Sequence, residues 1–175
     1  MTVEAFYVVR WVLAGGARYL LWRDGGSGPD EYALARGSSN ILVARSAQEL
    51  AQAARLNGLA VHGAEAQVID LQTVRSVLHS LRPSRPLSER SARVLLEAWN
   101  ALEDLARSLG NSFMTSEMSQ QREAKSAYAK LFYGNNLPAV TPEGSKCHPL
   151  LNDRERTVLR TLLRNAISRV ESYIS

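Results

Sequence analysis

Cys147 is followed directly by His148, and these two side chains, with His62 and His79, are best suited to nucleophilic or metal chemistry. A structural zinc site needs four Cys or His ligands at short, regular spacings. In this chain the other histidines lie far away in the sequence, and no CxxC or HxxxH pair occurs. The pattern therefore favours a loop cysteine beside a surface histidine, and we expect no metal and no cofactor. A small enzyme with a catalytic Cys147–histidine pair stays open as an alternative, because the two partners need only meet in space.

Paired carboxylates could perform acid–base catalysis, and the chain offers two such pairs: Glu103 with Asp104, and Asp153 with Glu155. We expect both pairs on solvent-facing surfaces or at helix starts, where the helix dipole favours acids. The glycine-rich stretch 25–28 lacks the GxxxxGK[ST] pattern of a phosphate-binding loop, so it is predicted to be a hairpin turn. Because no catalytic constellation emerges, the sequence indicates a binding protein and not an enzyme.

The charge of the chain bears on which partner it binds. The net charge is +4, from 21 basic and 17 acidic residues. Arginines and acids balance over residues 1–80, so the whole excess lies in the second half. No run of Lys and Arg reaches the roughly five to eight residues of a basic patch. We therefore expect a solvated surface and no nucleic-acid partner. A weak nucleic-acid binder that uses the arginines of the second half stays open as an alternative.

Cys147 is the single cysteine of the chain, which excludes an internal disulfide framework and suits a reducing cytoplasm. No apolar run approaches the roughly 20 residues needed to cross a bilayer. Residues 1–16 lack the charged-then-apolar layout of a secretory signal, and Arg10 interrupts their hydrophobic stretch. We therefore expect a cytoplasmic protein with no membrane partner.

The elements that must carry these residues change type near the middle of the chain. The first half alternates runs rich in aromatic and β-branched residues with glycine-containing turns, which predicts an antiparallel meander of three or four strands. Ser46 and Glu49 match a capping box, in which each side chain accepts a hydrogen bond from the amide of the other residue. The predicted strands are 6–13, 18–22, 32–36 and 41–44, with a further one at 66–71, and the predicted helices of this half are 46–57 and 72–81.

The second half is helical beyond a proline-containing boundary at 82–86. Apolar residues repeat at spacings of three and four, so helices are predicted over 88–109, 116–133 and 152–174, the first of them central because its apolar stripe is widest. The expected fold class is α+β: an N-terminal antiparallel β-sheet with one or two helices, and a C-terminal three-helix unit packed on it. We expect a single domain over 1–175, with a sheet-rich half at 1–81 and a helical half at 87–175.

One stretch is more particular than a generic surface: AKLFYGNNLPAVTPEG at 129–144, preceded by EAWNALEDLA at 97–106. With the strand-rich start and ILVARSAQEL at 41–50, this combination resembles immunity proteins that bacteria encode beside polymorphic toxins, including those of contact-dependent growth inhibition systems. After Gly144 the chain departs from the expected aromatic-and-proline pattern and carries KCHPLL at 146–151. The resemblance implies a protein that binds the C-terminal domain of a cognate toxin, often a nuclease, and neutralises it.

The loop after residue 133 is a candidate binding surface on physical grounds as well. Gly134 is predicted to end the preceding helix with a positive φ. Prolines at positions 138 and 142 stiffen the chain that follows, and an ordered loop binds at low entropic cost. Leu131, Leu137 and Pro138 are expected to pack on the helices, whereas Phe132 and Tyr133 are divided between packing and binding.

Charged side chains complete the candidate set. The acidic pair at 103–104 could face a basic surface, and Arg156 and Arg160, with Arg164, follow one helix face that is predicted to be a solvated flank or to meet an acidic patch. The candidate partner-binding residues are Phe132, Tyr133, Asn135, Asn136, Glu103, Asp104, Arg156 and Arg160.

Overall fold

The computed structural model describes residues 5–111 and 122–174, with the backbone alone for 63–66. The strands in these ranges are β1 (Ala5–Leu13), β2 (Gly16–Arg23), β3 (Glu31–Tyr32), β4 (Val43–Ala44) and β5 (Ala60–Asp70). The helices are α1 (Ala47–Leu56), α2 (Leu71–Ser80), α3 (Glu89–Ser108), α5 (Arg122–Gly134) and α6 (Asp153–Ile174). The predicted α+β fold class is therefore confirmed.

The sheet is built around the long antiparallel hairpin of β1 and β2. Its register runs from Tyr7 opposite Trp22 to Leu13 opposite Gly16. Gly16 has a φ of 110°, a conformation that residues with a side chain rarely adopt, so a glycine is needed at this turn. β3 and β4 pair with β2, and β5 pairs with β1, which gives the strand order β3-β2-β1-β5.

The predicted all-antiparallel meander is wrong for one strand, because β5 runs parallel to β1. A parallel neighbour needs a crossover through another element, and the chain passes through α1 immediately before β5. β5 is also longer than the predicted strand at 66–71. The predicted strand at 32–36 shrinks to the short β3 and an isolated bridge between Leu34 and Ile41.

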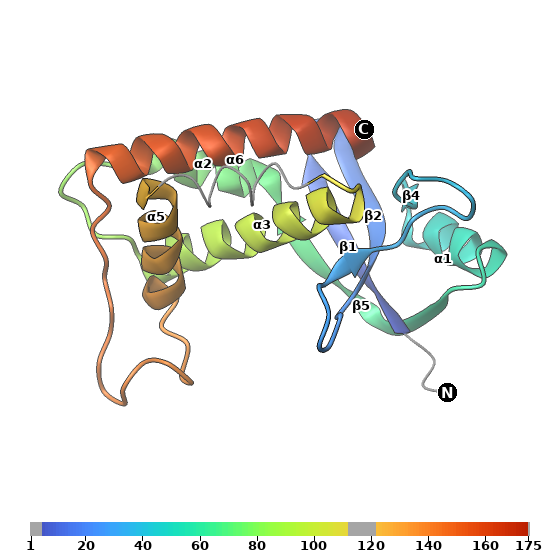
Figure 1. Ribbon diagram of the computed structural model, residues 1–175, viewed down its shortest axis with the longest axis horizontal. Helices are drawn as coiled ribbons and strands as arrows, with labels where there is room; N and C mark the ends of the chain where they lie inside the picture. The colour runs from blue at the N-terminus through green and yellow to red at the C-terminus, as the bar shows by residue number, and fades with distance from the viewer. Residues whose placement is uncertain (1–4, 112–121, 175) are drawn as a thin grey trace.

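Two apolar clusters lie on opposite faces of the sheet. Successive strand residues point to opposite faces, so Leu20 and Leu21 of β2 belong to different clusters. Leu20 packs with Trp11 on the side of the C-terminal helices, and Leu21 packs with Phe6 on the side of α1. Figure 1 shows the result: α1 lies on one side of the sheet, and α2, α3 and α6 extend away from it on the other.

Helix α3 is the centre of the C-terminal half. It lies against α2, α5 and α6 and also against β3 and β5. Trp99 and Leu102 are completely buried, and the Trp99 ring meets Tyr128 of α5 edge to face, with ring centroids 5.5 Å apart. The prediction of a central helix over 88–109 is therefore confirmed.

The predicted helix starts are confirmed by their caps. Ser46 Oγ accepts a hydrogen bond from the Glu49 amide at 3.1 Å, although Glu49 reaches back to the amide of Arg45 and not to that of Ser46. Ser88 caps α3 in the same way. Helix α2 starts one residue earlier than predicted, because Asp70 accepts hydrogen bonds from two amides of its first turn.

The predicted helix at 116–133 is seen from Arg122 onwards as α5, and its predicted first turns lie outside the described residues. Helix α6 matches the prediction of 152–174 to within one residue. Over the described ranges, every helix is too short or too polar to cross a bilayer.

Leu102 provides a test of the central role of α3. Replacing it by Ala removes a side chain with no exposed area and leaves a cavity between the packed helices, which should lower the free energy of unfolding by about 3 kcal/mol. Leu56, which is 75% exposed at the end of α1, is the matched control, and Leu56→Ala should cost less than about 0.5 kcal/mol. Urea denaturation followed by circular dichroism measures both. Equal losses would contradict the assignment.

Candidate functional site

The segment between α5 and α6, residues 135–152, is called here the connecting loop, and one side chain ties its two ends together. Asn136 Nδ2 donates to the carbonyl oxygens of Gly134 at 3.0 Å and Cys147 at 3.1 Å, while Asn136 Oδ1 accepts from the Cys147 amide at 2.6 Å. Asn136 has a φ of 50°, a left-handed conformation that Asn adopts more readily than most residues. The loop is therefore closed by hydrogen bonds although it contains no helix or strand.

Gly134 has a different role from the one predicted. It does not supply the positive φ at the end of α5; that conformation falls on Asn136. Gly134 is needed because the loop returns close to its backbone: a Cβ built there would lie 2.9 Å from Cγ of Pro149 and 3.2 Å from Cβ of Ala92. Any larger residue would push the second end of the loop away from the start of α3.

The connecting loop and the end of α5 expose large apolar side chains. Leu131 is buried as expected, but Leu137 is 38% exposed and Pro138 is exposed too, so the expectation that these two pack on the helices is wrong. Phe132 packs partly against the core, and its ring lies edge to face with that of Tyr133. The large apolar residues exposed in this region are Tyr133, Leu137, Val140 and Leu150.

Cys147 lies in this loop with its backbone held by Asn136, and its side chain is a partly buried free thiol. His148 is exposed, as are His62 and His79. In the part of the chain that the structure describes, no three His, Cys, Asp or Glu side chains gather as metal ligands would.

A further acidic pair, Asp30 with Glu31, lies near the pair at 103–104, where α3 meets the edge of the sheet. Burial raises the pKa of Asp104 to about 6, and the negative charge of Asp30 adds to the effect, while Arg107 opposes it. Arg107 Nη1 donates to Asp104 Oδ1 at 3.0 Å and to the Asp30 carbonyl at 3.3 Å. The expectation that the pair at 103–104 faces solvent is wrong, because the side chains of Glu103 and Asp104 are only 16% and 15% exposed. Glu103 also pairs with Arg107, at 3.6 Å.

The predicted arginines of α6 are buried to different extents. Arg156 is 7% exposed and pairs with Asp153. Arg160 donates to the carbonyl oxygens of Leu78 at 2.9 Å and Leu81 at 2.6 Å, and so satisfies the end of α2. Neither side chain lies on a solvated flank, because α2 and the loop after it cover this face of α6.

Glu155 is buried, with only 2% of its area exposed, although the sequence predicts a solvent-facing position at the start of the helix. Its carboxylate accepts hydrogen bonds from Ser126 Oγ at 2.6 Å, from Lys130 Nζ at 2.8 Å and from the Asn152 amide at 2.7 Å. Burial alone would raise the pKa of Glu155, but these bonds outweigh it and lower the pKa. The Asn152-x-x-Glu155 spacing, a variant of the capping box, is the signal that could have found this arrangement.

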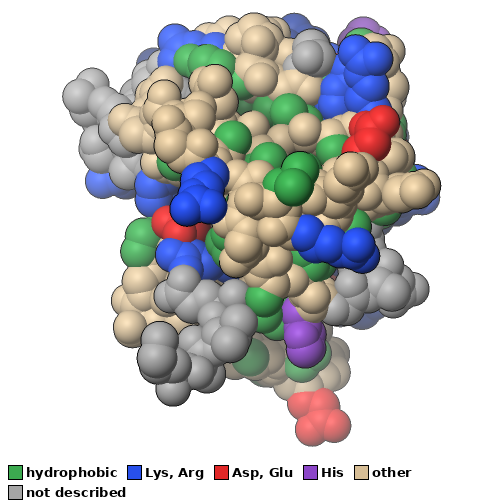
Figure 2. Space-filling model, turned by 90° about the vertical axis from the view of Figure 1, so that its right-hand side faces the viewer, with side chains coloured by type: hydrophobic (Ala, Val, Ile, Leu, Met, Phe, Trp, Pro, Cys, Tyr) green, Lys and Arg blue, Asp and Glu red, His purple; other side chains and the backbone are tan. Residues whose placement is uncertain are grey.

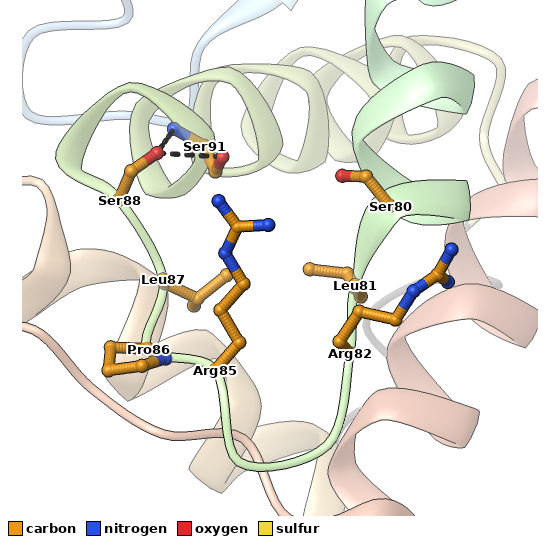
Figure 3. A pocket seen from close by; sticks show the side chains of 8 residues that line it. All are labelled: Ser80, Leu81, Arg82, Arg85, Pro86, Leu87, Ser88 and Ser91. Carbon is orange, nitrogen blue, oxygen red and sulfur yellow. Dashed lines mark hydrogen bonds between the residues drawn. The ribbon is translucent and has the colours of Figure 1, made fainter.

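The loop after α2 borders a hollow of about 240 Å³ at the start of α3. Figure 3 shows Arg85 extending towards Ser91, which is hydrogen-bonded to Ser88, whereas Arg82 turns to the other side of the loop. Arg82 Nη1 donates to the carbonyl of His79. This loop therefore distributes its positive charges to both sides.

No family model, curated protein or solved structure matches this chain. The geometry of the described residues is then the basis for a functional inference. The structure gathers Phe132, Tyr133, Asn135 and Asn136 at one end of the connecting loop, where Asn135 also accepts a hydrogen bond from Arg93. It places Glu103 and Asp104 at the sheet edge and Arg156 and Arg160 against α2, so the predicted partner-binding residues form three groups and not one.

Asn136 provides a test of how the connecting loop is held. Asn136→Ala removes three hydrogen bonds to the backbone, so proteinase K should cut residues 137–146 about tenfold faster while most of the core stays intact. Asn135→Ala, which removes one long bond to Arg93 at 3.3 Å, is the control and should leave the cleavage rate unchanged. Mass spectrometry of the fragments locates the cut. Equal cleavage rates in both variants would contradict the role of Asn136.

Glu155 provides a pH-dependent test. Because its pKa is lowered in the folded state, the carboxylate stabilises the fold above its unfolded pKa of about 4.3, and that contribution is lost as the pH falls. Glu155→Gln should therefore cost about 2 kcal/mol near pH 7 and much less near pH 3. Urea denaturation across this range measures the difference. Glu143→Gln, at an exposed position of the loop, is the control and should show no such trend.

Proposed function

We propose that this protein is an immunity protein that binds a cognate bacterial toxin domain and neutralises it by stoichiometric occlusion. The partner is the C-terminal domain of a toxin produced by the same cell, a nuclease in the form that the sequence resemblance favours. In this function the protein performs no catalysis and requires no cofactor. It acts in the cytoplasm, where a newly made or imported toxin domain would meet its substrate.

The observation that carries the proposal is the connecting loop, which is held at both ends and still exposes large apolar side chains. Tyr133 is 54% exposed and Val140 is 43% exposed, although burying such side chains would stabilise the fold. Contiguous apolar patches are typical of protein-binding surfaces, and we treat the exposed side chains of this loop as part of one such patch. The loop loses little conformational freedom on binding, because Asn136 already restricts it.

The sequence supports the proposal as well, because these side chains lie in the stretch that resembles immunity proteins. The stretch 129–144, which carries the resemblance to immunity proteins, covers the end of α5 and most of the connecting loop. The residues that are most particular in the sequence are therefore the ones that the fold exposes or uses to hold the exposed segment. A toxin domain bound to this surface would be inhibited sterically, without any chemical change to the toxin.

The acidic pairs are less suited to carry the interaction by imitating phosphate. Arg107 lies between Asp104 and Asp30 and pairs with the carboxylate of the first. One arginine compensates only part of this negative charge, but Asp104 is already paired and the Asp30 carboxylate accepts a hydrogen bond from the Gly25 amide. An inhibitor that mimics nucleic acid would need acids that remain available to its target. Occlusion by an apolar and ordered surface is the mechanism that the arrangement favours.

Rescue of growth tests this function. The protein and the toxin encoded directly upstream of its gene should be expressed together in a sensitive host, and the pair should co-purify. Tyr133→Glu combined with Val140→Glu places charges on the exposed surface and should weaken the complex by about 30-fold or more, with loss of rescue. Leu56→Glu, at the 75% exposed position in α1, is the matched control and should still rescue.

The outcomes separate the proposal from its enzymatic rival. A wild-type protein that neither rescues growth nor co-purifies with the toxin would contradict the proposed function. Cys147→Ser should rescue as well as the wild type does, because occlusion needs no thiol. If this variant loses rescue while still binding the toxin, Cys147 chemistry and not occlusion is responsible.

A further inference from the structure

We propose that the arginines gathered where the α2–α3 connection meets the start of α6 dock an acidic segment of the partner protein that also carries apolar side chains. This arginine surface consists of Arg82, Arg154, Arg156, Arg160 and Arg164. The inference rests on the proposed function in requiring a protein partner, and it adds the chemistry of the face that this partner presents. Figure 1 places both segments together at the end of the molecule farthest from α1.

The positive charges of two distant sequence segments act on each other in the fold. Burial lowers the pKa of Arg160, and the charges of its neighbours Arg156, Arg164 and Arg82 lower it further. Arg160 is held in place by its hydrogen bonds to the carbonyl oxygens at the end of α2. It therefore fixes the distance between the arginines of α6 and the one that follows α2. The modest net charge of the chain is concentrated here.

These charges are only partly compensated by nearby acids. Asp153 pairs with Arg156, whereas Glu155, on the same helix, is paired with Lys130. Within the described ranges, Arg82, Arg154 and Arg164 form no ion pair, and all three are exposed. Like charges held close together raise the energy of the free protein, and an acidic partner would lower it. The surface is thus complementary to carboxylates.

A hollow of about 620 Å³ adjoins these charges, and its lining is mixed. Pro83 and Leu150 supply apolar area, with Leu150 50% exposed. Arg154 and Arg156 supply positive charge, and Asp153, which pairs with Arg156, supplies one negative charge. Arg156 is 93% buried by area, yet its Nε has no hydrogen-bond partner in the described structure. This N–H is enclosed by protein atoms, so the hollow offers a ligand the charge of Arg156 and not this donor.

The lining favours an acidic protein segment over nucleic acid. Guanidinium groups pair readily with carboxylates, and Arg156 already contacts Asp153 through one nitrogen. The apolar part of the hollow matches Leu or Val side chains between acids, and Leu150 in its lining belongs to the connecting loop. A nucleic acid would instead require an extended row of phosphate contacts. Figure 2 shows the opposite, α1 side of the molecule, where Lys and Arg side chains lie among other types and form no extended row.

Peptide binding tests this inference without the toxin. The full chain is titrated at low salt with a fluorescein-labelled peptide of alternating Leu and Glu, and separately with a labelled single-stranded oligodeoxynucleotide of equal charge. The peptide should bind more tightly than the oligonucleotide. Arg82→Glu combined with Arg164→Glu should weaken peptide binding by about tenfold or more. The matched control, Arg36→Glu with Arg45→Glu, makes the same change in charge at exposed positions beside α1 and should leave peptide affinity nearly unchanged.

Each outcome has one meaning. Wild-type protein that fails to bind the peptide, equal losses in both double variants, or tighter binding of the oligonucleotide would overturn the inference. The single variants Arg82→Gln and Arg164→Gln, which add no negative charge, provide the same comparison if the double variant unfolds. Growth rescue without peptide binding would show that the toxin is held elsewhere. Peptide binding without growth rescue would contradict the proposed function but would still support an acidic ligand at the arginine surface.

Discussion

Helix α3 can be buried only if other elements surround it, and most of the architecture follows from this requirement. Its twenty residues carry apolar side chains around much of the circumference, so α2, α5, α6 and the sheet must all lie against it. The polar end of the helix extends the same constraint to the edge of the sheet: Ser108 Oγ accepts a hydrogen bond from the Tyr32 amide at 2.7 Å. A single helix thereby positions both the core and the short strand β3.

The start of α6 is fixed by polar contacts as well as by apolar packing. Glu155 joins α6 to α5 through Lys130, and Arg160 joins α6 to the end of α2. Lys130 also donates to the carbonyl of Leu150 at 2.8 Å, so the last residues of the connecting loop are held as well. The segments that expose apolar and cationic groups are therefore attached to the frame by buried charges. Stability and the presentation of these surfaces depend on the same residues.

The sequence predicts the parts of this fold that local patterns determine. The capping serines, the hairpin of β1 and β2 and the wide stripe of α3 all follow from spacing within one element. The parallel pairing of β5 does not, because it depends on how the chain returns after α1. The candidate site divides in the same way. Asn136 and Gly134 lie in a stretch that is unusual in sequence, although the positive φ expected at Gly134 falls on Asn136.

The meeting of residues 30–31 with 103–104, and of Arg82 with Arg160, is a property of the tertiary fold. Charges at regular spacings on a helix are identical in sequence whether water or another helix faces them. The sequence alone therefore predicts that Arg160 is a surface residue, and only the position of α2 shows that it is covered. The same holds for Glu155, whose burial depends on where Lys130 of the preceding helix lies. Residues whose partners are distant in sequence are the ones that the pattern alone misplaces.

The closure of the connecting loop by Asn136 separates two demands that usually compete in evolution. The hydrogen bonds that hold the loop run to main-chain atoms at its ends, so they do not depend on which side chains stand at 137–146. Substitutions there can alter the surface that a partner meets without altering the frame. Residues 137–146 could therefore diversify rapidly when the partner changes, while α5 and α6 keep their sequence.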